Sequence, residues 1–221
     1  MNKQIKNFHQ PTGFDDVYIL NSAKLWSIII RLSDGSLCVY SPLKGLKAPV
    51  IESIKELGDV SFILAPNHYH NKGIADHLDL FPDADLVCSD AARPRLIKQT
   101  GAQFSDIDNL IKQLPKHIRI LEPEGLKTGE VWFEVKKADN LLWVVCDAFS
   151  SEPQKGNKYR GTLSMLKTFP KYGVQDAETY EAWVKKLLSS QVPHFIVPCH
   201  GAPVEEGNLE PLITDLLDHH I

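Results

Sequence analysis

Short apolar runs alternate along this chain with segments in which apolar residues recur every three or four positions, a pattern typical of mixed α and β structure. In the first part of the chain, apolar runs at 17–20, 26–32 and 37–40 are separated by polar turns, so we predict a β-meander there. The run at 26–32 is nearly all apolar and β-branched, which predicts a strand buried on both faces.

The remaining pattern predicts strands at 60–64, 85–88, 118–121, 131–135, 141–146 and 194–197, and helices at 48–57, 74–80, 91–100, 177–190 and 208–217. Asp90 is expected to cap the helix at 91–100. Residues 103–114 are expected to form a polar helix or loop, and residues 150–161 a loop of a length associated with function or flexibility. His219 and His220 are expected to form an unstructured tail.

Each half of this order opens with strands and closes with alternating helix and strand. Helices outside two packed sheets, an αββα layering, would accommodate it, so we predict an α+β fold of two mixed sheets flanked by helices. Because 221 residues suffice for one sizeable core, a single domain over 1–221 is expected.

Composition narrows the classes of partner. A hydrophobic content of 43% and a charged content of 24% are ordinary for a soluble globular protein. The net charge of -4 gives no basic footprint for nucleic acid. The longest apolar runs are too short to span a bilayer, and the first seven residues lack the apolar stretch of a signal peptide. We therefore expect a cytoplasmic location, with no membrane or nucleic-acid partner.

The segment between the strand at 60–64 and the helix at 74–80 carries two histidines, His68 and His70. Ligands gather at the carboxyl ends of strands in open α/β sheets, and alternate residues of an extended segment point the same way. The pair could therefore present two imidazoles to one metal ion. The alternative is two solvated loop histidines. His77, one helical turn further on, is expected to be a surface residue of the helix.

Two other strands also end in a metal-binding residue type. Asp147 follows the strand at 141–146, and His200 follows the strand at 194–197. Alone, Asp147 is typical of a turn or a helix cap, and His200 of a structural or exposed histidine. With His68 and His70 they could supply three imidazoles and a carboxylate, a set that suits zinc or iron. Cys38, Cys88 and Cys146 lie in or beside apolar runs and are expected to be buried hydrophobic residues.

The chain resembles the metallo-β-lactamase fold superfamily over nearly its whole length. The resemblance rests on the meander, the His-x-His loop, the aspartate that ends an apolar strand, and Pro198-Cys199-His200-Gly201, where the family usually has Pro-Gly-His-Gly. More narrowly, the segments at 31–37, 40–42, 65–67 and 81–84 resemble the domain-of-unknown-function 4336 group within that superfamily. The superfamily resemblance implies a four-layer αββα sandwich.

The same resemblance shows which ligands are missing. The family loop reads His-x-His-x-Asp-His, and here Lys72 stands in the aspartate slot and Gly73 in the last histidine slot. The family's third histidine lies in a Gly-His-Thr-Pro-Gly turn, and its counterpart at 125–129 has Leu126 in the ligand position.

The resemblance thus leaves two interpretations of the centre. In one, a single zinc or iron ion is held by His68, His70, Asp147 and His200. In the other, the centre is a metal-free relic in which these groups hydrogen-bond one another. An ammonium of Lys72 pointing into the site would discourage a metal by like-charge repulsion, whereas one pointing to solvent would have no effect.

Three functions remain open on these grounds. The first is a metal-dependent hydrolase of a small-molecule substrate, in which Asp147 is both ligand and base and Lys72 stabilises a developing oxyanion. The second is a catalytically inactive binding or scaffold protein, which the missing ligands favour. The third is a redox role, as in family members with two irons and a flavin domain, and the missing ligands argue against it.

Overall fold

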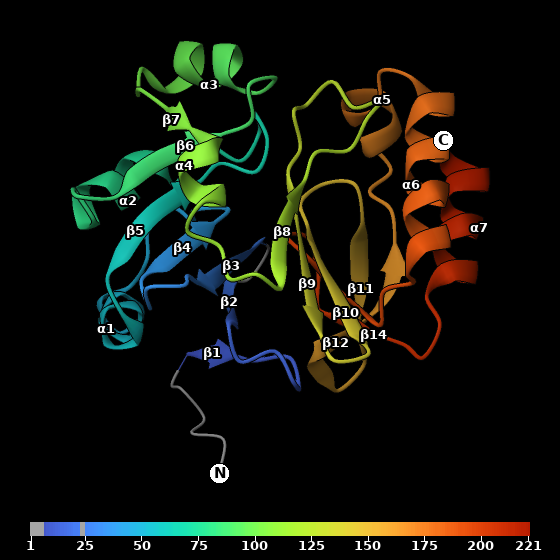
Figure 1. The fold of residues 1–221 in the computed structure, drawn as a ribbon, viewed down its shortest axis with the longest axis horizontal. Helices are drawn as coiled ribbons and strands as arrows, with labels where there is room; N and C mark the ends of the chain where they lie inside the picture. Colours follow the sequence, from blue (N-terminus) through green and yellow to red (C-terminus); the bar gives the residue numbers. More distant parts are fainter. Residues whose placement is uncertain (1–6, 23–24) are drawn as a thin grey trace. The chain divides into compact units, whose positions relative to one another are not determined.

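The computed structural model describes residues 7–22 and 25–221, and the chain divides into two compact units, Met1–Lys116 and His117–Ile221 (Figure 1). Most of the N-terminal segment on which the expected location rests, residues 1–6, lies outside the described residues. The expectation that both units form one domain stays a prediction.

The first unit is a mixed sheet with helices. Its seven strands run in the order β1-β2-β3-β4-β5-β6-β7, antiparallel from β1 to β4 and parallel from β4 to β7. The strands are β1 (Phe8–His9), β2 (Val17–Ser22), β3 (Leu25–Arg31), β4 (Leu37–Tyr40), β5 (Val60–Leu64), β6 (Asp85–Cys88) and β7 (Ser105–Asp106). The helices are α1 (Ala48–Leu57), α2 (Ile74–Leu80), α3 (Arg93–Thr100) and α4 (Ile107–Ile111).

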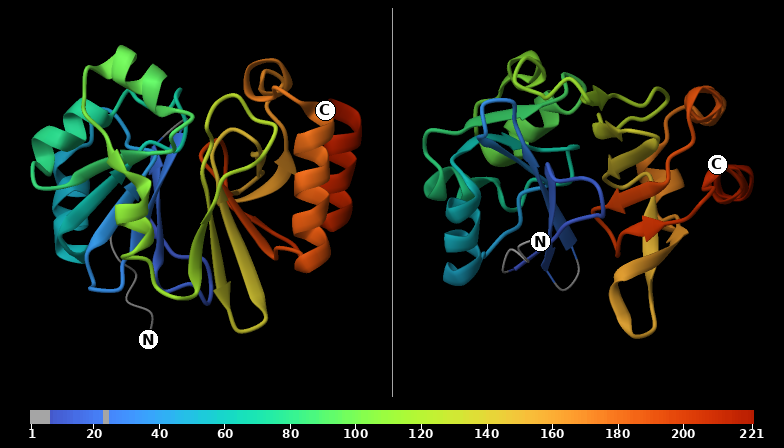
Figure 2. Two further views of the ribbon diagram at one scale, coloured as in Figure 1. Left: turned by 45° about the horizontal axis from the view of Figure 1, so that its top comes forward. Right: turned by 60° about the horizontal axis from the view of Figure 1, so that its bottom comes forward.

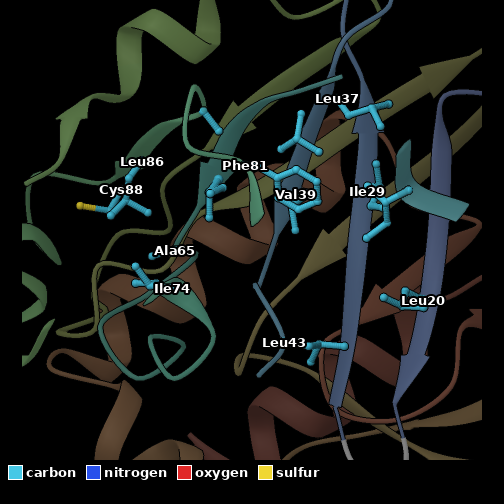
Figure 3. Close-up of a cluster of buried hydrophobic side chains, with 14 of the residues drawn as sticks. Leu20, Ile29, Leu37, Val39, Leu43, Ala65, Ile74, Phe81, Leu86 and Cys88 are labelled. Carbon is cyan, nitrogen blue, oxygen red and sulfur yellow. The ribbon is translucent and has the colours of Figure 1, made fainter. Parts of the chain in front are cut away.

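Alternate side chains of the first unit's strands and the apolar faces of its helices build one hydrophobic cluster. Figure 3 shows members from β2 to β6 and from α2, among them Ile29, Val39 and Leu86. The predicted burial of β3 on both faces is confirmed, because all five residues between its ends are buried. Ala65 and Ile74, which bracket the histidine loop, both belong to this cluster, so the loop is fixed at both ends.

The second unit has a five-stranded mixed sheet and a separate hairpin. The sheet order is β14-β13-β10-β9-β8, and β10 with β13 is its parallel pair. These strands are β8 (Ile118–Leu121), β9 (Trp132–Lys137), β10 (Asn140–Val145), β13 (Phe195–Pro198) and β14 (Val204–Glu205). The hairpin is β11 (Ser150–Gln154) and β12 (Asn157–Ser164), and the helices are α5 (Phe169–Gly173), α6 (Ala177–Ser190) and α7 (Glu210–His220).

Helices α6 and α7 lie side by side against the second unit's sheet (Figure 1 and Figure 2). Beneath them, Trp132 is the hub of an aromatic group. Its ring centroid lies 5.6 Å from that of Trp143, 5.8 Å from Phe149 and 5.3 Å from Trp183. Such pairs add about 0.5–1.5 kcal/mol each beyond area burial. These ring contacts hold Trp132, the first residue of β9, in place, and Glu130 lies two residues before it.

Four predictions about helix, strand and loop segments were wrong in whole or in part. Helix α3 begins at Arg93, and Asp90 binds the Arg93 guanidinium at 2.8 Å instead of capping the helix. The segment at 103–114, expected to be a helix or loop, contains helix α4 but also strand β7, which pairs with β6. The expected loop at 150–161 forms most of the β11–β12 hairpin, which turns at Gly156 with a φ of 85°. The expected tail histidines lie in the last turn of α7.

The predicted α+β class, with two mixed sheets that each carry helices, is confirmed. Both units also repeat the predicted order of strands first and alternating helix and strand afterwards. Across the described residues, every helix is too short or too polar to cross a membrane.

His77 was expected at the surface, and that expectation was wrong. The residue is buried, and its ring Nδ1 donates to the Gly73 carbonyl oxygen at 2.9 Å. Burial lowers the pKa of His77 from its ordinary value of 6.5, although the Gly73 carbonyl and Asp76 oppose this shift. The imidazole is therefore held neutral inside the fold.

The pH dependence of stability should report this histidine. Below about pH 6.5 the unfolded chain binds a proton at His77 that the folded chain refuses. As the pH is lowered through that window, the free energy of unfolding should therefore decrease. His77 should contribute at most about 1.4 kcal/mol of this decrease per pH unit. His77→Asn should lose less stability than the parent between pH 7 and 5 in urea titrations. His220→Asn, at an exposed site, is the control, and equal slopes for parent and His77→Asn would contradict the assignment.

Candidate metal centre

The histidine loop leaves the carboxyl end of β5, next to the end of the parallel strand β4. The two strands are in register at Tyr40 and Leu64, so Ser41 and Ala65 are the first residues beyond the pair. Asn67 then turns the chain: its buried Oδ1 accepts hydrogen bonds from the backbone N–H groups of Tyr69 at 2.8 Å and His70 at 3.1 Å. Asparagine commonly forms this local turn.

His70 is oriented by Ser41, a residue that the sequence analysis did not single out for the site. The Ser41 Oγ lies 2.8 Å from the His70 Nδ1. Ser41 is buried and has a φ of 59°, in the left-handed region that is unfavourable for a non-glycine residue. Its own backbone N–H donates to the Leu64 carbonyl oxygen at 3.1 Å. Strained residues of this kind cluster at functional sites. The contact through Nδ1 leaves Nε2 as the ring atom suited to a metal.

The other residues of the loop have separate environments. His68 is buried, and its ring centroid lies 4.4 Å from that of Tyr69 in an edge-to-face arrangement. Tyr69 is exposed, with the Arg95 guanidinium 4.7 Å from its ring centroid. Lys72 is exposed as well, the arrangement under which its ammonium leaves a metal undisturbed.

Gly73, which stands where the family has a histidine, leaves no room for a side chain. A Cβ atom placed there would clash with the Pro42 carbonyl oxygen and lie 2.6 Å from the Leu43 carbonyl carbon. Both obstacles are backbone atoms, which cannot rotate away as a flexible side chain would. The first unit therefore cannot supply the histidine of a second metal site without moving its backbone.

In the second unit, Asp147 and His200 leave the adjacent ends of the parallel strands β10 and β13. The last pair in register is Val145 with Pro198, and each proposed ligand lies two residues further on. The Asp147 Oδ1 and the His200 Nε2 are 2.9 Å apart, and both side chains are largely buried. Topology thus brings together two residues that are 53 positions apart in sequence.

The turn that carries His200 is braced by the hairpin. Ser151 of β11 donates its backbone N–H to the His200 carbonyl oxygen at 2.9 Å, and its hydroxyl donates to the Ala202 carbonyl. A Cβ atom at Gly201, whose φ is 105°, would meet the backbone of Ser151. The segment at 150–161 thus acts as a rigid support for the turn at 199–202.

Glu130, like Ser41, is a residue beside the candidate ligands that the sequence analysis did not single out. Its carboxylate is buried and accepts hydrogen bonds from the backbone N–H groups of Cys146, Asp147 and Ala148. Burial raises the pKa of Glu130, and the neighbouring charge of Asp147 raises it further, while the donors oppose both effects. Ligand atoms of Glu130, Cys146 and Asp147 all lie within 4.8 Å of one another.

Leu126 and the cysteines make apolar contributions to the second unit. Leu126, at the family's third histidine position, packs against the hydrophobic cluster and forms an isolated bridge with Val174. All four cysteines are buried, as predicted for the three that were singled out. Burial raises the pKa of Cys146 far above its ordinary value, which disfavours its thiolate as a metal ligand.

The donor atoms of these residues fit a metal centre with fewer ligands than the family has. Two ligand atoms bound at about 2.1 Å lie roughly 3 Å apart in octahedral coordination and roughly 3.4 Å apart in the tetrahedral coordination usual for zinc. The Asp147–His200 distance of 2.9 Å is close to the octahedral value and is also that of a direct ion pair. His68 and His70 share one braced loop in the first unit. That all four residues hold the same ion stays a prediction.

Comparisons with known proteins were made at the levels of sequence and structure. No protein-family model and no curated protein sequence matches this chain. The narrower resemblance to the domain-of-unknown-function 4336 group therefore stays an expectation.

Solved structures do match. A metallo-β-lactamase from Pontibacter korlensis aligns with a TM-score of 0.63 and 12% identity, over 96% of this chain and 98% of that one. The rubredoxin oxygen:oxidoreductase from Desulfovibrio gigas aligns with a TM-score of 0.66 and 10% identity, over 95% and 60% of the two chains.

The Flv1 flavodiiron core from Synechocystis aligns with a TM-score of 0.61 and 11% identity, over 96% of this chain and 61% of that one. The chain thus spans about three-fifths of these two longer structures and nearly all of the metallo-β-lactamase. Identities of 10–12% establish the fold and leave the activity open. The protein has the metallo-β-lactamase-like fold.

Proposed function

We propose that this chain is a metal-dependent hydrolase of a small-molecule substrate, with a single zinc or iron ion held by His68, His70, Asp147 and His200. The observation that carries the proposal is the 2.9 Å approach of Asp147 and His200 at the ends of parallel strands. The bracing of His70 by Ser41 supports it, because histidine ligands of metals usually bond through their second ring nitrogen to an orienting group.

Each residue has a defined part in this proposal. An ion bound there supplies Lewis acidity toward a substrate carbonyl or phosphoryl oxygen and lowers the pKa of water. Asp147 takes the proton of the attacking water, since the aspartate slot of the loop holds Lys72. Lys72 is exposed on the loop and would turn toward a bound substrate to stabilise a developing oxyanion.

The alternative is a metal-free binding or scaffold protein. The same 2.9 Å ion pair of Asp147 with His200 also suits this alternative, because the two groups can satisfy each other directly. The closed position of Gly73 and the apolar packing of Leu126 favour it too, since they remove one ligand from each of the family's two metal sites. The two functions differ in whether the purified protein holds a stoichiometric ion.

Metal analysis decides between them. Protein purified without added metal, and after supply of zinc or iron, should contain roughly one ion per chain by mass spectrometry. His68→Ala and His200→Ala should each lower zinc affinity at least tenfold, because each removes a ligand. His220→Ala, an exposed histidine of α7, is the matched control and should keep the ion. A parent protein without an ion under all conditions would leave the metal-free alternative.

Ser41 gives a second test at atomic detail. In zinc-loaded protein, long-range ¹⁵N NMR should find the His70 proton on Nδ1, donated to the Ser41 hydroxyl. Ser41→Ala and Ser41→Gly both remove this hydroxyl and should weaken zinc binding by about tenfold. Glycine tolerates the left-handed backbone, so Ser41→Gly should be more stable than Ser41→Ala by about 1 kcal/mol. A His70 proton on Nε2 in the loaded protein would contradict the assignment.

A further inference from the structure

A single buried carboxylate holds the backbone on which Asp147 lies. The Glu130 Oε1 accepts hydrogen bonds from the Trp132 indole Nε1 at 2.7 Å, from the Cys146 backbone N at 3.1 Å and from the Ala148 backbone N at 3.2 Å. Its Oε2 accepts from the Asp147 backbone N at 3.0 Å. Three successive backbone N–H groups thus converge on one side chain, the arrangement in which protein backbones bind anions.

The position of these N–H groups explains why a carboxylate is needed. Strand β10 pairs with β9 as far as Val144 and with β13 as far as Val145, so residues 146–148 lie just beyond both ladders. Buried backbone donors require acceptors, and Glu130 supplies them where the sheet does not. Hydrogen bonds to an ionised acceptor are also stronger than neutral ones.

A buried carboxylate at position 130 is energetically unfavourable next to Asp147. Glu130 is buried within reach of Asp147, and two carboxylates at this distance repel each other. A glutamine would avoid that repulsion and would still offer one acceptor oxygen. A bound cation removes the disadvantage, because the second negative charge then strengthens its attraction to the site.

We propose that Glu130 is a positioning residue for the metal centre: it fixes the backbone of Asp147 and, ionised when a cation is bound, adds negative charge behind that ligand. This inference rests on the proposed single-ion function. Glu130 acts through Asp147 and does not itself bind the ion or the substrate. Trp132 holds the Glu130 carboxylate in place, because its indole N–H donates to Glu130 while its ring packs in the aromatic group of the second unit.

The chain offers a matched control in Glu134. This second buried carboxylate of the same unit also accepts an indole N–H, that of Trp143 at 3.3 Å, and it pairs with Arg119 at 2.6 Å. It lies on β9, and neither of these partners, Arg119 and Trp143, belongs to the turn at 146–148. Glu134→Gln therefore removes a comparable buried charge without touching the backbone of Asp147.

The test uses the full chain and zinc chloride as the probe, with zinc affinity measured by competition against a chromophoric chelator. Glu130→Gln should weaken zinc binding by about 10- to 100-fold, the usual effect of losing a partner that orients a ligand. Glu134→Gln should change it less than about threefold. In the Glu130→Gln, Asp147→Asn double variant the losses should not multiply, because both act on one ligand. Urea titration confirms that each variant is folded at the assay temperature.

Amide hydrogen exchange without metal separates the two proposals. Glu130→Gln should speed exchange at Cys146, Asp147 and Ala148 at least tenfold relative to Glu134→Gln. If the parent binds no zinc, the proposed single-ion function is wrong, and so is the role of the Glu130 charge in binding an ion. Faster exchange in Glu130→Gln would then support only the fixing of the Asp147 backbone by Glu130. If the parent binds zinc and Glu130→Gln binds it within threefold of the parent, Glu130 is a structural tie only and the inference is overturned. Multiplying losses in the double variant would overturn it as well.

Discussion

Parallel strand pairing is the constraint on which each half of the candidate centre depends. Parallel neighbours end at the same edge of a sheet, so the residues that follow them meet however far apart they are in sequence. In the first unit the pairing of β4 with β5 brings Ser41 to His70. In the second unit the pairing of β10 with β13 brings Asp147 to His200. Register brings the strand ends together, and the path of the loops beyond them completes both contacts.

Beyond the strand ends, side chains form the hydrogen bonds to the backbone that neighbouring strands form within the sheet. Asn67 closes the turn of the histidine loop, Ser151 holds the backbone of His200, and Glu130 collects the three N–H groups around Asp147. These groups are buried or partly buried, so each missing hydrogen bond would cost about 1–3 kcal/mol. The result is two rigid platforms, each of which presents a pair of metal-binding residue types.

The family ligands that this chain lacks are replaced by groups with structural roles. Gly73 allows the backbone of the loop to pass close to Pro42 and Leu43, which no histidine would permit. Leu126 packs into the hydrophobic cluster of the second unit. Restoring all of the family's metal ligands would therefore require changes in packing as well as in residue identity. The packing of the chain thus agrees with a centre that has fewer ligands.

Much of the fold was predictable from the sequence, because apolar periodicity directly reflects burial. The bounds of β4, β5, α1, α2 and α6 agree with the predicted ranges to the residue. The hairpin at β11 and β12 was not predictable, because its strands are polar and their pairing, more than burial, defines them. His77 was misjudged since a histidine carries no sequence signal for a neutral, buried state.

By itself the sequence determined the α+β class, the strand ends that carry His68, His70, Asp147 and His200, and the missing family ligands. Only the tertiary structure decided that Ser41 orients His70, that no side chain fits at Gly73, and that Glu130 holds the backbone of Asp147. The physical reason is distance along the chain. Periodicity encodes which residues are buried, whereas a hydrogen bond between residues 17 or 29 positions apart depends on strand register and backbone path, which no local pattern contains.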